Sequence, residues 1–296
     1  MYEDNKWYGH RYILLKYLNI EKDQRIFAQI QHGWFGNIPN PWVDKNKSFL
    51  NSIVPTLSWN KKYKNKKIIP IGSPFLYLDK ILPKKKIYSN GTLFIPSHSR
   101  SSSEKIQNNK INDIKDPIIL DDKGIPRLYK INLNFEFFVK KIEKKFKPPY
   151  TVCFHPADYT RENIEFFKRK KWHVVAVVSR NNNFSLMDLR KLLLKNEQIV
   201  FSDFTSSALI YSMYLKKKIK ILKHKNDWLV KKIERLNKKI FKNYQNIEIA
   251  YNISKKELGY DFIKSKSELR KILDLNNPIK KIISYTVGFY RDLKYK

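Results

Sequence analysis

Strands and helices alternate between residues 172 and 223, and this stretch decides the fold. It reads WHVVAVVS (172–179), SLMDLRKLLLKN (185–196), QIVFSD (198–203), SSALIYSMYLKK (206–217) and KIKILK (218–223). The first, third and last segments are short and apolar, and the β-branched residues of the first favour a buried strand. The other two have the apolar spacing of helices, and Ser185 is the predicted N-cap of the first. This alternation is typical of βαβ units and a parallel sheet.

The alternation continues toward the N-terminus. Apolar spacing predicts helices over 134–146 and 160–170, with a strand at Tyr150–Phe154 between them. TLFIP (92–96) predicts a further strand, whereas residues 104–130 lack periodicity and are typical of an insertion or a long loop. The end of the chain has mainly helical spacing, with one predicted strand at IEIAY, residues 247–251.

A smaller set of elements precedes the polar stretch KKKIYSNG (84–91), where we place a domain boundary. Residues 11–18 and 75–82 have helical spacing, and RIFAQIQ ending at His32 (26–32) and KIIPI (67–71) predict strands. We therefore expect an α/β protein with an N-terminal domain over 1–88, a C-terminal domain over 89–275 and a basic helix over 276–296.

Composition narrows the class of protein. Of 296 residues, 42% are hydrophobic, which is enough to bury a core and excludes wholesale disorder. Cys153 is the only cysteine, which excludes a disulfide scaffold and fits a reducing cytoplasm. No apolar run approaches the ~18 residues of a membrane span, and the first residues have no signal-peptide core. We expect a cytoplasmic protein, at most peripheral on the inner face of the membrane.

The net charge of +33 has several explanations. It fits nucleic acid, an anionic membrane surface or an acidic substrate as partner. It also fits a composition simply rich in Lys, Asn and Ile, since Lys far outnumbers Arg, which bidentate phosphate and base recognition prefer. The basic segments 215–241 and 278–296, interpreted as helices, are compatible with a solvated face or with a membrane surface.

Polar clusters follow five predicted strands. Because ligands of open parallel sheets bind beyond the carboxyl ends of the strands, these clusters predict a cleft built from two sheets. The clusters are His32-Gly33, Gly72-Ser73-Pro74, Ser97 to Arg100, His155-Pro156 and Ser202 to Ser207.

Three of these clusters suggest chemistry. Thr205, Ser206 and Ser207 open a predicted helix, where hydroxyls and backbone N–H groups either bind a phosphate or cap the helix. His155 ends a strand and either donates to a phosphate or a ribose or is an ordinary solvated or core histidine. His32 is either a general base or a structural loop residue.

Other motifs are weak or missing. Asp121 and Asp122 offer a carboxylate base or a metal site, but LDDKG is also a typical turn. The sequence has no GxxxxGK[ST], strand-linked GxGxxG, HExxH or GxSxG motif and no zinc-type Cys/His cluster. We expect no metal and no resident cofactor.

The order QHG, IGSP, PSHSR, FHP and SDFTSSALIYSMYLKKKIKIL resembles the GT-B glycosyltransferase superfamily. The resemblance is to CDP-glycerol glycerophosphotransferases and bacterial sialyltransferases of cell-surface polysaccharide synthesis. It covers about residues 25–225. It implies two Rossmann-like parallel-sheet domains facing a cleft, with a reduced N-terminal domain, and metal-independent transfer from a nucleotide-activated donor to a polysaccharide or lipid-linked acceptor.

The resemblance also implies roles for residues. His32 would be the catalytic base, with Asp121 or Asp122 as a weaker alternative. Gly33, Gly72 and Ser73 would lie on the acceptor side. The donor and its phosphates would be bound by His155, Pro156, Thr205, Ser206, Ser207, Ser97 and Arg100. We expect no nucleic-acid partner; the alternative is a non-catalytic, basic nucleic-acid-binding protein, and a sugar-nucleotide epimerase ranks lower.

Overall fold

The computed structural model describes most of the chain. It covers residues 8–20, 26, 28–31, 33–34, 56–60, 68–83, 87–96, 118–120, 126–128, 133–155, 158–177, 182–202, 206–222, 234–275 and 277. Within these ranges the protein is α/β, with two parallel sheets and a two-stranded hairpin.

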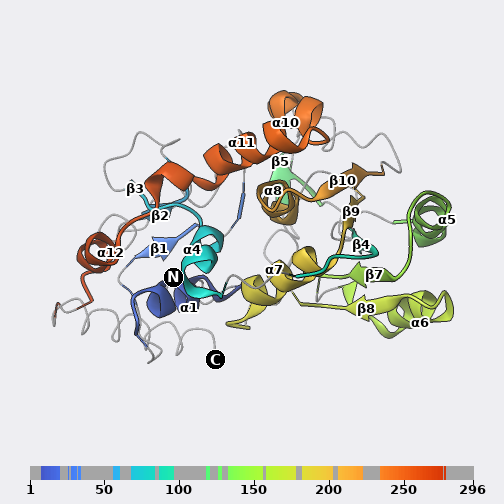
Figure 1. The fold of residues 1–296 in the computed structure, drawn as a ribbon, viewed down its shortest axis with the longest axis horizontal. Helices are drawn as coiled ribbons and strands as arrows, with labels where there is room; N and C mark the ends of the chain where they lie inside the picture. The colour runs from blue at the N-terminus through green and yellow to red at the C-terminus, as the bar shows by residue number, and fades with distance from the viewer. Residues whose placement is uncertain are drawn as a thin grey trace.

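The larger sheet has five parallel strands in the order β10-β9-β4-β7-β8 (Figure 1). The chain starts at the central strand β4, moves outward through β7 to β8, and then returns to the other side of β4 for β9 and β10. This is a doubly wound order, whose direction reverses between β4 and β9. The strands are β4 (Thr92–Ile95), β7 (Tyr150–Cys153), β8 (His173–Val175), β9 (Gln198–Phe201) and β10 (Lys218–Ile221).

Helices cover both faces of this sheet. Right-handed crossovers place helices on one face while the chain moves one way and on the other face after it turns back. The strand side chains alternate accordingly: Phe94 and Val152 belong to an outer aromatic cluster with α5 and α6, whereas Leu93 and Cys153 belong to the central core. The helices are α5 (Phe135–Lys145), α6 (Arg161–Arg169), α7 (Ser185–Lys195) and α8 (Ser207–Tyr214).

The smaller sheet lies in the N-terminal part of the chain. Its strands β1 (Gln29–Ile30), β2 (Thr56–Ser58) and β3 (Ile68–Pro70) are parallel and follow the chain order. Helix α1 (His10–Tyr17) precedes it, and α4 (Pro74–Ile81) follows it and packs on α1.

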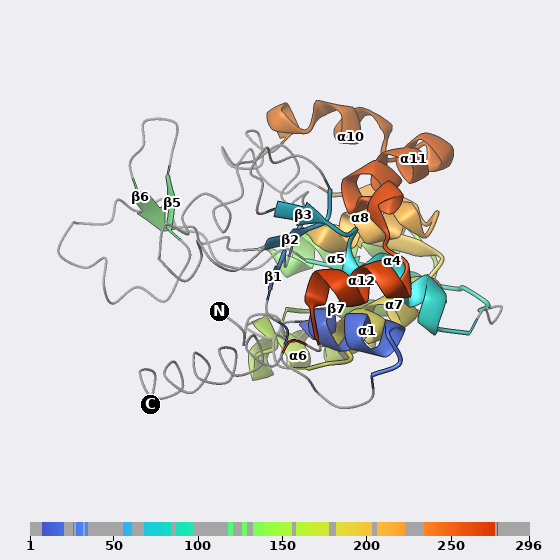
Figure 2. The same ribbon diagram turned by 90° about the vertical axis from the view of Figure 1, so that its left-hand side faces the viewer.

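The C-terminal helices return to this smaller sheet. Helix α11 (Ile247–Leu258) packs along α8, and the Arg270 guanidinium of α12 (Lys266–Leu273) donates to the Leu18 carbonyl beyond α1, at 2.7 Å. Figures 1 and 2 show α12 at the end of the molecule that holds α1 and the smaller sheet. The domain limits remain a prediction, but residues 257–275 contact the elements that precede residue 88. Helix α10 (Lys238–Asn243) and the short helix η4 (Tyr260–Phe262) flank α11.

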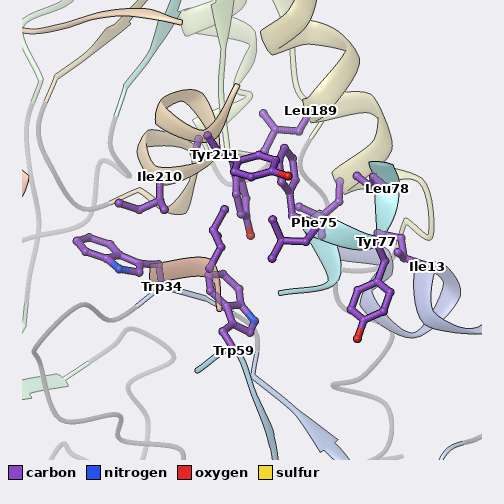
Figure 3. Packing of buried hydrophobic residues seen from close by; sticks show 14 of the residues in the cluster. Ile13, Trp34, Trp59, Phe75, Tyr77, Leu78, Leu189, Ile210 and Tyr211 are labelled. Atoms are coloured by element: carbon purple, nitrogen blue, oxygen red, sulfur yellow. The ribbon is translucent and has the colours of Figure 1, made fainter. Parts of the chain in front are cut away.

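One continuous hydrophobic core joins the two sheets. At its centre the Phe75 ring of α4 stacks on the Tyr211 ring of α8, with centroids 4.1 Å apart, and Trp59 lies beside Tyr211 at 6.1 Å (Figure 3). All three side chains are almost fully buried. Helix α8, buried from Ala208 to Tyr214, therefore packs against both halves of the protein.

Several expectations from the sequence are corrected. IEIAY is helical: the Asn246 side chain caps α11 by accepting from the Ile249 N–H, so the alternation of Ile and Glu does not mark a strand. Ser185 is not an N-cap but the first residue of α7, fully buried behind Phe184. Strand β8 is only partly buried because the chain leaves it to return to β9, which makes it a sheet edge.

Three further differences concern single segments of the chain. Residues 104–130 include an antiparallel hairpin, β5 (Ile118–Leu120) with β6 (Pro126–Leu128), rather than loop alone. Strand β2 was not predicted because its segment TLS (56–58) has a single apolar residue. The basic segment 215–241 includes strand β10 as well as α10, so it is not a continuous helix. The remaining predicted strands and helices between 10 and 222 are confirmed within a few residues.

Candidate functional site

The switch point of the larger sheet is the geometric centre of the candidate site. Ile95 at the end of β4 pairs in register with Phe201 at the end of β9. The carboxyl ends of both strands therefore lie side by side, and this is where doubly wound sheets bind ligands. The predicted cluster at Ser97 and Arg100 follows one strand, and the hydroxyl cluster at Ser202 to Ser207 follows the other.

The N-terminus of α8 lies at this switch point. Ser206 is the N-cap, and its Oγ accepts from the Ala208 N–H at 3.1 Å. Ser206 therefore has the capping role that the sequence left open. The Ala208 and Leu209 N–H groups of the first turn both donate to Ser206, and the helix dipole favours an anion beside them.

The turn after β1 is held by a network around Gln31. The Gln31 side chain donates to the Gly33 carbonyl at 2.8 Å and accepts from the Trp59 N–H at 3.0 Å. The Trp59 indole donates to the Gln31 carbonyl, also at 3.0 Å. Both neighbours of His32 are thus tied to the ends of β1 and β2, although His32 itself lies outside the described residues.

Trp34 joins this turn to the C-terminal half. Its backbone N–H donates to the Ser207 Oγ at 2.9 Å, and its indole N–H donates to Glu257 Oε2 at 2.6 Å. In Figure 3 the Trp34 ring lies beside Ile210 of α8. Trp34 and Ser207 are 173 residues apart in the chain. Their contact brings the turn after β1 and the hydroxyl cluster together at the carboxyl edges of the two sheets.

Gly72 and Ser73, expected on the acceptor side, are buried in the structure. Ser73 is fully buried and caps α4 by accepting from the Phe75 N–H, and burial raises the pKa of Tyr211, whose hydroxyl bonds the Ser73 side chain. The Ser73 N–H donates to the Leu258 carbonyl at 2.8 Å. Gly72, at φ 76°, packs where a Cβ would lie 2.9 Å from the Gly259 carbonyl. Ser73 thus supplies a donor to one of the last carbonyls of α11, which need donors, and Gly72 allows the close approach of the chain after it.

His155 lies on the other side of β4 from the hydroxyl cluster. It follows β7, is half-buried, and its carbonyl accepts from the Asp158 N–H at 2.9 Å. Since β4 alone separates β7 from β9, the two strand ends are about 10 Å apart. A diphosphate group spanning the end of β4 would fill this interval.

Several predicted site residues lie outside the described residues. Their positions in the site stay predictions: His32, Ser97, Arg100, Asp121, Asp122, Pro156 and Thr205. Asp121 and Asp122 fall between the paired strands β5 and β6, a position that suits the turn interpretation.

Gln31, Trp34 and Glu257 are site-forming residues that the sequence did not single out. Gln31 and Trp34 directly flank the His-Gly pair, and this position in the sequence could have identified them as site residues. The sequence around Glu257 contains no such signal, because its partners are distant in the chain. Its carbonyl accepts from the Asn60 side chain, and its carboxylate accepts from the Trp34 indole.

Comparisons with protein-family models, curated proteins and solved structures found no significant match to this chain. Within the ranges given above, no three His, Cys, Asp or Glu side chains gather closely enough to hold a metal ion. In the same ranges, no helix combines the length and apolarity that crossing a bilayer requires.

Proposed function

We propose that this protein is a GT-B-type transferase that moves a sugar or polyol-phosphate group from a nucleotide-activated donor to an acceptor of cell-surface polysaccharide synthesis. The observation that carries the proposal is the hydrogen bond from the Trp34 N–H to Ser207 Oγ. It joins the carboxyl edge of one parallel sheet to the switch point of the other. A transferase of two substrates needs such a junction between two ligand-binding edges.

The donor diphosphate would bind at the start of α8. The hydroxyl oxygens of Ser206 and Ser207 already accept hydrogen bonds, from Ala208 and Trp34, which fixes their positions. Each hydroxyl retains its proton to donate to a phosphate oxygen. Together with the helix dipole and with Thr205, His155, Ser97 and Arg100, these donors would stabilise the charge of the departing nucleotide.

The acceptor would enter beside the turn after β1. His32 is the proposed base, and the hydrogen bonds of Gln31 restrain the backbone on both sides of it. The acceptor hydroxyl oxygen attacks the transferred group as its proton passes to neutral His32, and the nucleotide leaves with the electron pair of the broken bond. Exclusion of water from the crevice would limit hydrolysis of the donor.

A nucleotide panel tests the proposal. We expect at least one of CMP, CDP, UDP and GDP to raise the melting temperature, since a ligand at 100 times its Kd adds about 2.7 kcal/mol to stability. Ser206→Asp keeps a capping acceptor but adds a negative charge at the phosphate position, and should abolish this response. The control Thr160→Asp adds the same charge at the exposed N-cap of α6 and should leave the response intact.

Turnover separates the two sites. His32→Ala should abolish transfer from the responding donor while nucleotide binding is retained. Loss of nucleotide binding in His32→Ala would contradict its acceptor-side role. If no nucleotide stabilises the protein and duplex or single-stranded DNA binds with a steep salt dependence, the nucleic-acid-binding alternative replaces the transferase.

A further inference from the structure

A cavity with polar and apolar walls lies at the edge of the smaller sheet opposite the switch point. It has a volume of about 580 Å³ and is formed by the ends of α1 and α4 and the start of α12. Helix α4 begins at the carboxyl end of β3 and runs back, so its last turn lies away from the switch point. Figure 2 shows α1, α4 and α12 together around this region. This cavity is therefore separate from the proposed transferase site.

Three lysines from three distant elements converge on the cavity. Lys16, Lys80 and Lys266 line it, and no carboxylate does. Among the residues that the structure describes, none of the three forms an ion pair. The Lys266 ammonium donates to the Asn19 side chain at 2.9 Å and lies 5.7 Å from the Tyr17 ring centroid.

Helix electrostatics explains two of these lysines but not the third. Lys16 and Lys80 occupy the last turns of α1 and α4, where a cation offsets the helix dipole. Lys266 is the first residue of α12, where a cation is disfavoured. Its ammonium nevertheless extends toward Asn19 at the end of α1, into a cavity that already holds two positive charges. A bound anion would offset this repulsion.

The walls of the cavity are held in place. The Tyr17 hydroxyl donates to the Lys264 carbonyl at 3.1 Å, and the Lys264 N–H donates to the Tyr77 hydroxyl at 3.0 Å. The Tyr17 and Tyr77 rings meet edge to face, with centroids 4.9 Å apart. These bonds fix the loop before Lys266 against α1 and α4, the helices that carry Lys16 and Lys80.

We propose that this cavity binds a phosphorylated ligand: one or two phosphate groups on a small organic scaffold. Lysines bind phosphate as point charges, and a cavity of this size suits a small ligand. The rings of Tyr12 and Tyr17 provide apolar walls for the organic part. The same chemistry occurs in soluble phosphorylated metabolites and in phospholipid headgroups. The inference does not depend on the proposed transferase activity.

Matched triple variants test the site. The pocket variant is Lys16→Gln, Lys80→Gln, Lys266→Gln; the control is Lys144→Gln, Lys145→Gln, Lys147→Gln at the end of α5. Both remove three exposed positive charges, so both should fold. Isothermal titration uses inorganic pyrophosphate as the probe, in a Ser206→Asp background that blocks the switch-point site. We expect pyrophosphate affinity to fall about tenfold or more in the pocket variant only.

A second measurement uses the protein without ligand. Removing mutual repulsion should raise the melting temperature of the pocket variant above that of the control. Equal pyrophosphate affinities in the two variants would overturn the proposal and assign the binding to net charge alone. If nucleotides still stabilise the Ser206→Asp variant while pyrophosphate affinity falls only in the pocket variant, the cavity proposal is supported without the transferase proposal.

Vesicle flotation distinguishes the two sources of phosphate. If phosphatidylglycerol vesicles retain the control but release the pocket variant at matched charge, the ligand is a phospholipid headgroup. If both variants float equally while only pyrophosphate binding differs, the ligand is a soluble phosphorylated molecule. Phosphatidylcholine vesicles, which carry no net charge, should bind neither variant.

Discussion

The two parallel sheets are built in different ways. The five-stranded sheet is covered by helices α5 to α8, each of which connects two of its own strands. The three-stranded sheet depends on segments from both ends of the chain: α1 comes before it, and the end of α11 and α12 reach it from beyond residue 256. One sheet is therefore assembled from neighbouring segments, and the other needs nearly the whole chain.

The packing of aromatic side chains follows the same division. Phe94, Phe138 and Phe167 form an outer cluster that involves only the larger sheet and its helices. The central core, with Phe75 and Tyr211, includes residues from both sheets. Damage to the outer cluster should remain within one half, whereas damage to the central core should loosen both.

The largest expected effect comes from Phe75→Ala, compared with Phe138→Ala. Each removes a fully buried ring, which costs about 3–5 kcal/mol of unfolding free energy. Hydrogen exchange should distinguish them: Phe75→Ala should speed exchange in β2, β3 and α8, and Phe138→Ala mainly in β4, β7 and α5. Identical exchange patterns would mean that the molecule opens as a single unit, and the comparison would fail.

A smaller effect is expected at the polar contact between the halves. The Tyr214 hydroxyl of α8 donates to Asp79 of α4 at 2.6 Å, and Arg190 of α7 pairs with the same carboxylate. Burial and the bond to Asp79 raise the pKa of Tyr214. Tyr214→Phe should cost about 1.5–3 kcal/mol, as expected for a hydrogen bond to a charged group, measured by denaturant unfolding.

Tyr150→Phe is the matched control for this contact. It removes a hydroxyl that donates to the neutral Phe146 carbonyl within the larger half, at 2.8 Å, and should cost about 1 kcal/mol. Equal losses in the two variants would show that the Asp79 contact adds no special stability between α4 and α8.

The smallest expected effect is a difference in labelling rate between two buried thiols, Cys153 and one introduced into the smaller sheet. Burial raises the pKa of the Cys153 thiol from 9.0 to about 11, so little thiolate is present at pH 8 and labelling by a disulfide reagent should be slow. Because the folded state favours the neutral thiol, its contribution to stability is present below pH 9 and is lost as the pH rises through about 11.

The second thiol reports on the smaller sheet. Ser58→Cys, in a Cys153→Ala background, replaces a fully buried hydroxyl of β2. We expect it to react faster than Cys153, because the smaller sheet is closed by the chain ends and should open more often. A Ser58→Cys thiol that reacts no faster than Cys153 would contradict the difference between the two halves.

Periodicity was a sound guide where structure is local. Apart from the hairpin β5–β6, the strands and helices from Thr92 to Ile221 follow from apolar spacing and β-branched runs, because each segment buries its own face against the next. Periodicity failed at IEIAY, where the Asn246 cap and packing on α8 favour a helix. It also missed β2, because TLS (56–58) has a single apolar residue between two hydroxyl side chains.

The candidate site was predictable only as separate pieces. That Ser206 and Ser207 open a helix after a buried strand is a local property of their sequence. That Ser206 caps this helix while Ser207 meets Trp34 depends on how α8 is packed. The same packing withdraws Gly72 and Ser73 from the surface, because they supply donors and space to the end of α11.

The amino-acid sequence alone determined the α/β class, the parallel larger sheet and the location of polar clusters at strand ends, since these depend on short-range patterns of side chains. Tertiary structure decided the rest: the strand order with its switch point, the return of α11 and α12 to the smaller sheet, and the lysine cavity. These features join residues up to about 250 positions apart, such as Lys266 and Asn19, 247 apart. Contacts of that separation arise from packing of complementary surfaces and have no periodic trace in the chain.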